Sequence, residues 1–366
     1  MASQFYTDIR QVPELCESER KELERVTRKY EFKASRYYLS LIDWNDPADP
    51  LRQIVIPSLT ELSPWGRLDA SKESKYTVMP GLQHKYNSTA LLLVSDTCAC
   101  ICRYCFRKRI FRADYGEKVR DLEAALGYIA AHPEINNVLL TGGDPLMLAP
   151  KKLGAIMERL RGVDHVRIIR IGTKVPAYLP SRIVDNPGFA EAIRRASTSE
   201  RRVYCIVHFN HERELTDTAL TALDVLLQSG AILANQTPLL RGVNDDPLVL
   251  ANLFNRLSYI GVPPYYVFQC RPTLANKDFA VPVEEGYTIF EEAKSRCSGL
   301  AKRARFVMSH ETGKIEVVGM TESEVFLKYL RAECDRDSSR FVVMKRNPAA
   351  YWYDDYGEPV AEQYLE

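Results

Sequence analysis

Asp96 to Arg109 read DTCACICRYCFRKR, and four cysteines fall within eight residues of this stretch. Three of them, Cys98, Cys102 and Cys105, follow a C-x3-C-x2-C pattern. Three thiolates on one tight loop can hold three irons of a [4Fe–4S] cluster and leave the fourth iron without a protein ligand. An iron with an open position can bind the amino and carboxylate groups of S-adenosylmethionine (SAM). The loop therefore predicts a [4Fe–4S] cluster that binds SAM, with these three cysteines as ligands.

Cys100 leaves an alternative open, because it is a possible fourth ligand. A zinc site or a non-catalytic iron–sulfur site would use all four cysteines, but C-x-C-x-C-x2-C lacks the paired C-x2-C spacing that is typical of zinc sites. Five further cysteines are scattered singly and are interpreted as small buried apolar side chains: Cys16, Cys205, Cys270, Cys297 and Cys334.

The sequence after about residue 90 alternates short aliphatic runs with longer amphipathic stretches. The strand-like runs are Ala90–Ser95, Asn137–Leu140, Val166–Ile171, Val203–Phe209, Ile232–Gln236 and Tyr265–Gln269. The helix-like stretches lie near 117–131, 150–162, 187–197, 216–229, 246–260 and 283–299. This order predicts an α/β protein with consecutive right-handed βαβ units and a partial (β/α)6 barrel. The barrel is expected over 89–300, after an N-terminal helical extension (1–88, with an amphipathic stretch over 14–39) and before a C-terminal segment (301–366).

Polar and glycine residues follow the ends of these strands. In βα barrels the functional residues lie at the carboxyl ends of the strands. The residues in those positions include Gly142, Gly143, Asp144, His208, Gln236 and Arg271. Two adjacent glycines after a strand let a ligand approach the backbone closely, and with the cysteine loop one unit upstream they fit a contact to the amino group of SAM.

The bulk composition excludes some classes of function. The 366 residues carry a formal net charge of +1, which provides no field to hold a nucleic acid. The first ten residues, MASQFYTDIR, contain no apolar core of a signal peptide, and no apolar run is long enough to span a bilayer. A cytoplasmic protein without a membrane partner is therefore expected.

The chain resembles the lysine 2,3-aminomutase (KamA) family of radical SAM enzymes from about residue 37 to about residue 356. The matching segments are YLSLID (38–43), PGLQHKY (80–86), LLL (91–93), the cysteine loop, LLTGGD (139–144), RIGT (170–173), LPSRI (179–183), HFNH (208–211), NQ (235–236), LLRGVND (239–245) and PYYVFQC (264–270). This resemblance implies an isomerase that moves an amino group from Cα to Cβ of an amino acid. The cluster would reduce SAM to a 5′-deoxyadenosyl radical, and the substrate nitrogen would be held as an imine of pyridoxal 5′-phosphate (PLP). A flavodoxin- or ferredoxin-type electron donor and a homo-oligomer are also implied.

The resemblance assigns roles to individual residues. Arg107 matches the arginine that binds the substrate carboxylate, and His208 and Gln236 match residues that line the SAM site. Lys314, in the run His310-Glu311-Thr312-Gly313-Lys314, is the candidate PLP lysine, although the run keeps one glycine of the family's glycine-rich pattern. An ordinary exposed lysine is the alternative at this position. Two arginines that surround the PLP phosphate in the family are replaced by Lys85 and Thr89, so one charge is missing.

Two positions bear on the substrate. Where the lysine enzymes have two aspartates that face the distal ammonium of lysine, this chain has Arg271 and, nearby, Ser309. A cation repels a lysine side chain and pairs with a carboxylate, so an acidic or neutral side chain is expected, with glutamate as the simplest substrate. Arg271 could instead pair with Glu311 and leave the pocket neutral. A lysine 2,3-aminomutase, or a PLP-independent radical SAM enzyme on the same scaffold, remain alternatives.

Overall fold

The computed structural model describes residues 4–112 and 116–364. Its central feature is a run of parallel strands in which each strand pairs with the next one along the chain, and the first six of its seven strands form the predicted barrel. These six strands are β5 (Thr89–Ser95), β6 (Asn137–Gly142), β7 (Ile168–Thr173), β8 (Val203–Val207), β9 (Ile232–Leu239) and β10 (Pro264–Gln269). The predicted α/β fold with a partial barrel is confirmed, and each strand begins and ends within a few residues of its predicted range.

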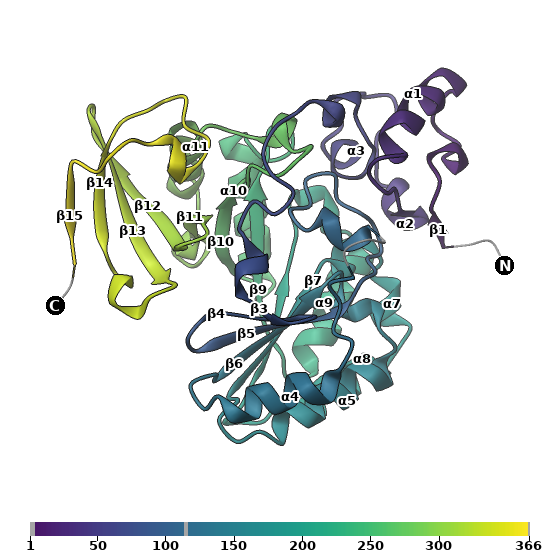
Figure 1. Cartoon of the computed structure of the whole chain (residues 1–366). Helices are drawn as coiled ribbons and strands as arrows, with labels where there is room; N and C mark the ends of the chain where they lie inside the picture. Colours follow the sequence, from purple (N-terminus) through teal and green to yellow (C-terminus); the bar gives the residue numbers. More distant parts are fainter. Residues whose placement is uncertain (1–3, 113–115, 365–366) are drawn as a thin grey trace.

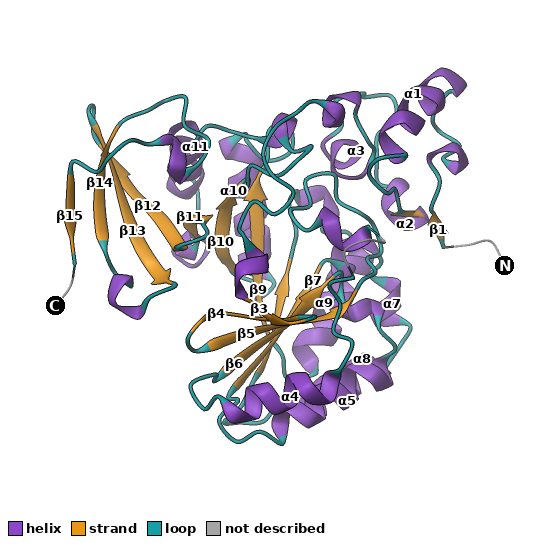
Figure 2. Ribbon diagram, viewed as in Figure 1, coloured by secondary structure: helices purple, strands orange, loops and turns teal. Residues whose placement is uncertain are grey.

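The predicted helices between the strands are present and pack along the outer side of the sheet (Figure 2). They are α4 (Leu122–Ala131), α5 (Pro150–Arg161), α8 (Gly188–Ala196), α9 (Asp217–Gln228), α10 (Pro247–Tyr259) and α11 (Val283–Ser295). Asp121, Thr216 and Asp246 begin three of them, because each side chain accepts a hydrogen bond from a backbone N–H of the first turn. Two additional short helices follow β7, namely α6 (Val175–Tyr178) and α7 (Ser181–Val184).

The sheet extends beyond the predicted barrel at both edges and contains 13 strands within the described residues. Beyond β10, β11 (Arg305–Ser309) runs parallel and is followed by the antiparallel strands β12 (Gly313–Met320), β13 (Glu324–Ala332), β14 (Phe341–Lys345) and β15 (Ala361–Gln363). Beyond β5 lie β4 (Leu82–Tyr86) and β3 (Thr77–Met79). Figure 1 shows β12 to β15 on one side of the molecule and the N-terminal helices on the other. The predicted division at 88/89 and 300/301 stays a prediction, since one sheet continues across both points.

The N-terminal segment is less helical than predicted. It contains α1 (Glu17–Thr27), α2 (Arg36–Leu39) and α3 (Pro50–Val55), with β1 (Phe5–Tyr6) paired to β2 (Ala34–Ser35). The expected amphipathic helix over 14–39 is wrong between Thr27 and Arg36, where the chain is extended before α2 begins. Tyr30, Phe32 and Ala34 are buried while Glu31 between them is exposed. An alternation with period two is that of extended chain, and it ends the helix.

Polar contacts join the two edges of the sheet across the open side of the barrel. The Tyr76 hydroxyl donates to the backbone oxygen of Glu311 (2.7 Å) and to the Glu333 carboxylate (2.8 Å). Lys72 pairs with Glu311 (2.8 Å) and Lys75 pairs with Glu333 (2.7 Å). These contacts hold the segment before β3 against the loop before β12 and the end of β13, so the space inside the curved sheet is enclosed.

Buried side chains form one hydrophobic core between the parallel strands and their helices, and a second between α10, α11 and the C-terminal strands. Cys205, Cys270 and Cys297 are buried as predicted, whereas Cys16 and Cys334 are exposed and contradict that prediction, because both lie at turns outside the cores. Among the helices that the structure describes, none is long and apolar enough to cross a membrane.

Candidate active site

A cavity of about 270 Å³ lies inside the curved sheet. Seven residues that were predicted from the sequence line it, together with Thr89: Lys85, Arg107, His208, Gln236, Arg271, Ser309 and Lys314. They come from both edges of the sheet and from the strands between. The structure therefore brings the predicted substrate and PLP residues, and two of the predicted SAM residues, to one space.

Lys314 points into this cavity from β12 and is not the exposed lysine of the alternative interpretation. Its ammonium nitrogen lies 4.1 Å from the ring centroid of Tyr266 and 5.3 Å from that of Phe268. Burial lowers the pKa of Lys314 well below its usual value, and the charges of Arg170 and Arg331 lower it further. Burial and the neighbouring cations therefore favour the neutral amine, which is the form that can react with an aldehyde.

Arg107 lines the same cavity, but a protein carboxylate already occupies part of its guanidinium. Its Nη2 and Nε donate to the two oxygens of Glu73 at 2.7 and 3.1 Å, and its Nη1 donates to Thr141 Oγ1 at 3.2 Å. Arg109 donates to Glu73 as well. Burial alone would raise the pKa of Glu73, yet Arg107 and Arg109 lower it well below its usual value. Glu73 is thus an ionised part of the site that the sequence did not reveal.

Arg271 is stacked on Phe106, with its guanidinium carbon 3.8 Å from the ring centroid. Its Nη1 is buried and has no hydrogen-bond partner in the described part of the chain. Burial lowers the pKa of Arg271 to about 10, while the charge of Glu73 opposes that shift. Glu311 pairs with Lys72 instead (2.8 Å), so the alternative Arg271–Glu311 pair does not form. Arg271 therefore lines the cavity and keeps one buried donor that no group of the described chain satisfies.

The cysteine loop separates Cys100 from the other three cysteines. Cys100 is buried in the hydrophobic core, and its Sγ accepts a hydrogen bond from the Ser35 N–H at 3.2 Å. Cys102 Sγ lies 2.9 Å from the Tyr178 hydroxyl. Within residues 4–112 and 116–364, no side chains converge as the ligands of a single metal ion would. A cubane takes one thiolate per iron, so its ligands need not converge on one point.

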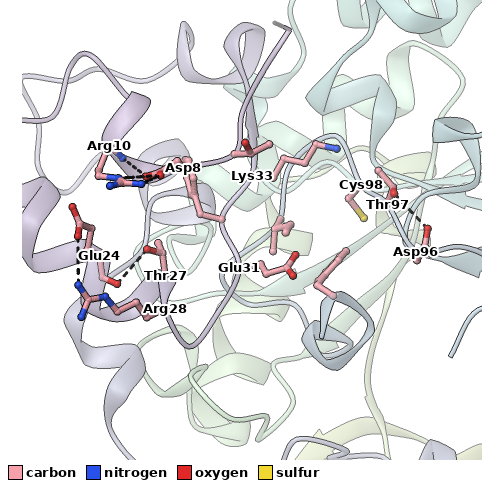
Figure 3. A pocket seen from close by; sticks show the side chains of 14 residues that line it. Asp8, Arg10, Glu24, Thr27, Arg28, Glu31, Lys33, Asp96, Thr97 and Cys98 are labelled. Carbon is pink, nitrogen blue, oxygen red and sulfur yellow. Dashed lines mark hydrogen bonds and ion pairs between the residues drawn. The ribbon is translucent and has the colours of Figure 1, made fainter. Parts of the chain in front are cut away.

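Cys98 faces a second cavity of about 690 Å³, between the N-terminal segment and the cysteine loop. Figure 3 shows Lys33 extending from the N-terminal segment toward the loop that carries Cys98. Burial raises the pKa of the Cys98 thiol, with Asp144 adding to the shift and Lys33 opposing it. A metal that binds this thiol must therefore displace its proton.

The Gly142–Gly143–Asp144 turn supports the cysteine loop. Gly142 has φ +113°, and the Gly143 N–H donates to Ser95 O at 2.7 Å. A Cβ on Gly143 would lie 2.6 Å from the backbone nitrogen of Thr97, so only glycine fits beside this loop. The Asp144 carboxylate accepts from Thr173 Oγ1 at 2.8 Å, which ties the ends of β6 and β7 together. None of the three residues lines the central cavity, and their contact with SAM stays a prediction.

His208 and Gln236 both line the central cavity, from the end of β8 and from β9. Burial lowers the pKa of His208 to about 3, and the charges of Lys174 and Arg107 add to the shift. His208 is therefore a neutral imidazole that can donate and accept one hydrogen bond each. Their role at SAM stays a prediction.

Comparison with known proteins decides the family. The model of the radical SAM superfamily matches residues 92–253, from β5 into α10. A protein of Aquifex aeolicus (strain VF5), provisionally named an L-lysine 2,3-aminomutase, is 52% identical over 98% of this chain and 96% of its own length. The L-lysine 2,3-aminomutase of Clostridium subterminale is 38% identical over 72% of this chain and 62% of its own length. That of Escherichia coli (strain K12) is 34% identical over 74% and 78%.

The chain belongs to the L-lysine 2,3-aminomutase family. It is therefore a radical SAM isomerase that needs a [4Fe–4S] cluster, SAM, a reductant and an amino-acid substrate, and its KamA homologues use PLP. The structure fits these groups. With Cys100 buried against Ser35, Cys98, Cys102 and Cys105 would provide the incomplete ligand set that SAM requires. Lys314, which has aromatic rings beside it and whose neutral amine is favoured, would hold the aldehyde of PLP.

Proposed function

We propose that the protein is an amino-acid 2,3-aminomutase for a substrate with an acidic or neutral side chain, of which glutamate is the simplest. The observation that carries this proposal is the unpartnered, buried Nη1 of Arg271 inside the cavity that also contains Arg107 and Lys314. A buried guanidinium without a partner is costly, and a substrate carboxylate would satisfy it.

The charges of the cavity support the same substrate class. Among the described residues that line it, Glu73 is the one carboxylate, and Arg107 and Arg109 already bind it. Besides Lys314, five lysine and arginine side chains line the cavity, namely Lys85, Arg107, Arg170, Arg271 and Arg331. The distal ammonium of a lysine substrate would find no free carboxylate here and would be repelled by Arg271.

The protein groups then have separate tasks. When bound, the cluster with SAM supplies a 5′-deoxyadenosyl radical, and PLP supplies the π-system that stabilises the migrating radical. Arg107 and Arg271 would orient the substrate through its carboxylates, and Lys314 would hold the cofactor. Tyr266 and Phe268 line the cavity wall beside Lys314 and keep water away from this region.

A lysine 2,3-aminomutase is the second candidate, because the relatives are named for lysine. The two candidates are separated by anaerobic assay of the cluster-loaded protein with SAM, PLP and a chemical reductant. Glutamate and lysine are supplied in parallel, and β-amino products are measured by mass spectrometry. Formation of β-glutamate supports the proposal. Turnover of lysine without turnover of glutamate contradicts it.

Borohydride reduction of the same protein tests the cofactor independently of turnover. A pyridoxyl adduct that maps to Lys314 supports an aminomutase, and Lys345, an exposed lysine on β14, serves as the control position. Cleavage of SAM without any adduct would instead support the PLP-independent alternative.

A further inference from the structure

One end of the central cavity, beside Lys314, gathers cations that no carboxylate of the described chain neutralises. We propose that Arg331 and Arg170 form the guanidinium pair that binds the phosphate of PLP. The inference rests on the proposed function, because it requires PLP at Lys314. It assigns the phosphate-binding charge to β13 and β7, two strands on which the sequence predicted no phosphate-binding residue.

The strand register places Arg331 next to Lys314. The two residues are direct partners in the antiparallel pair β12–β13, so their side chains lie on the same face of the sheet. Both side chains line the central cavity. A cofactor held covalently by Lys314 would therefore lie within reach of Arg331.

Arg331 binds neutral partners, and no carboxylate of the described chain pairs with it. Its Nη1 donates to Thr89 Oγ1 at 3.0 Å and its Nη2 donates to Ser88 Oγ at 2.8 Å. The guanidinium lies over the ring of Tyr86, 4.4 Å from the centroid, which fixes its plane. Two hydroxyls and a guanidinium at one point are a suitable donor set for a phosphate.

Arg170, the second arginine of the proposed pair, also has only a neutral hydrogen-bond partner in the described chain. Its Nε donates to the amide oxygen of Asn137 at 2.8 Å, and no described carboxylate forms an ion pair with it. Lys85, a third cation at this cavity, donates its Nζ to the backbone oxygen of His310 at 2.6 Å, which is also a neutral partner. Arg331, Arg170 and Lys85 are each partly buried, and no described carboxylate forms an ion pair with them, so a dianion bound at this end of the cavity would balance their charge.

This arrangement explains the absence of an arginine at position 89. Thr89 is buried, and the space beside it is filled by the guanidinium of Arg331, which arrives from the opposite edge of the sheet. An arginine on β5 would compete with Arg331 for that space. The positive charge is thus retained at the site but carried by a different strand.

Binding of PLP and of pyridoxal, which lacks the phosphate, tests the inference. Cluster-loaded protein freed of PLP is titrated with each compound and followed by absorbance, in the wild type and in Arg331→Gln, Arg331→Lys and Arg170→Gln. Arg305→Gln is the matched control, since Arg305 is a β11 arginine that faces Glu316 and is half-exposed. A thermal melt of each variant shows that it is folded.

Loss of one charge-assisted contact is expected to weaken PLP binding by about 10- to 100-fold in Arg331→Gln and in Arg170→Gln, with pyridoxal binding unchanged. Arg331→Lys should be intermediate because it keeps the charge and loses the planar fork. Adding Thr89→Arg to Arg331→Gln should restore PLP affinity, since it returns a guanidinium to the same space.

Three outcomes would overturn the inference: unchanged PLP affinity in both glutamine variants, equal losses for PLP and pyridoxal, or no PLP binding by the wild type. Phosphate selectivity that depends on Arg331 in a protein that isomerises no amino acid would support the inference and contradict the proposed function. The experiment can therefore contradict the proposed function without contradicting the phosphate-binding inference.

Discussion

Glu73 binds Arg107 through both of its carboxylate oxygens, with N–O distances of 2.7 and 3.1 Å. The arginine that was predicted to bind the substrate carboxylate is thus already paired on two of its three nitrogens. Its remaining nitrogen, Nη1, bonds Thr141. Arg271, whose Nη1 has no partner in the described chain, is the freer guanidinium of the two. Substrate recognition is therefore expected to involve both arginines, with Glu73 setting the position of Arg107.

Replacing Glu73 by glutamine tests this positioning role. The change leaves Arg107 and Arg109 buried without their carboxylate, and we expect the free energy of unfolding to fall by about 3–5 kcal/mol. Urea unfolding measures the difference. Glu117→Gln is the matched control, because Glu117 also binds Arg109 but is more exposed, and its effect should be much smaller. Equal effects of the two variants would contradict the role assigned to Glu73.

The difference in the free energy of unfolding between wild type and Glu73→Gln should depend on pH in a defined direction. The pKa of Glu73 in the folded protein is lowered well below the usual 4.5. The unfolded state therefore takes up a proton near pH 4.5 that the folded state refuses, so the stabilisation is full above pH 4.5 and declines as the pH falls below it. The gap between wild type and Glu73→Gln in urea unfolding should be constant from pH 8 to about 5.5 and should narrow below about 4.5. A gap that stays constant below pH 4.5 would show that the pKa of Glu73 is not shifted, and a gap that narrows as the pH rises would show that it is raised.

Arg271 is predicted to select the substrate. Arg271→Gln should lower kcat/KM for glutamate by about 10- to 100-fold, because one charge-assisted hydrogen bond is lost. Arg271→Asp should gain activity on lysine, since it places a carboxylate where a lysine ammonium would lie. Arg241→Gln provides the control, as Arg241 is a half-exposed arginine paired with Glu285. An unchanged kcat/KM for glutamate in Arg271→Gln would exclude a substrate contact.

The parallel part of the fold was predictable because each strand is an aliphatic run between two amphipathic helices, a pattern with few alternatives. The antiparallel edge was missed, although it carries a period-two signal. In β12, Ile315 and Val317 are buried and alternate with Lys314 and Glu316, which are less buried. The alternation in β12 is short and lies between turns. It therefore does not predict a strand unless the neighbouring strands are already known.

The candidate site was predictable where a local motif defines it and not where tertiary contacts do. The cysteine loop and Lys314 belong to short runs whose spacing has chemical meaning. Glu73 and Arg331 belong to none. Glu73 meets Arg107 across 34 residues, and Arg331 meets Thr89 across 242 residues. Such contacts form only when distant strands of the curved sheet come together, and the sequence pattern does not reveal which strands do so.

Cys100 is predicted to be dispensable for the cluster. Its Sγ faces Ser35 in the core, so Cys100→Ala should keep full iron content and visible absorption after anaerobic reconstitution. The stability cost should be about 1–2 kcal/mol for the lost sulfur contacts. Cys98→Ala, Cys102→Ala and Cys105→Ala should each lose most of the cluster. Loss of iron in Cys100→Ala would instead indicate a four-thiolate site.

Lys314 should make the PLP-free protein less stable than it would be with an apolar residue at this position. Because burial lowers its pKa below the usual 10.5, the unfolded state binds a proton that the folded state does not, and stability rises with pH up to about that value. Lys314→Met should therefore raise the free energy of unfolding at pH 7 by about 1–3 kcal/mol, since it removes a buried amine of similar shape. The gain should shrink as the pH approaches 10.5, where only the pH-independent cost of burying the neutral amine is left. Lys345→Met, at an exposed position on β14, should show no such pH-dependent gain. A Lys314→Met protein that is less stable than wild type at pH 7 would mean that the ammonium is charged and paired in the folded state, and Lys314 would then be unsuited to hold PLP.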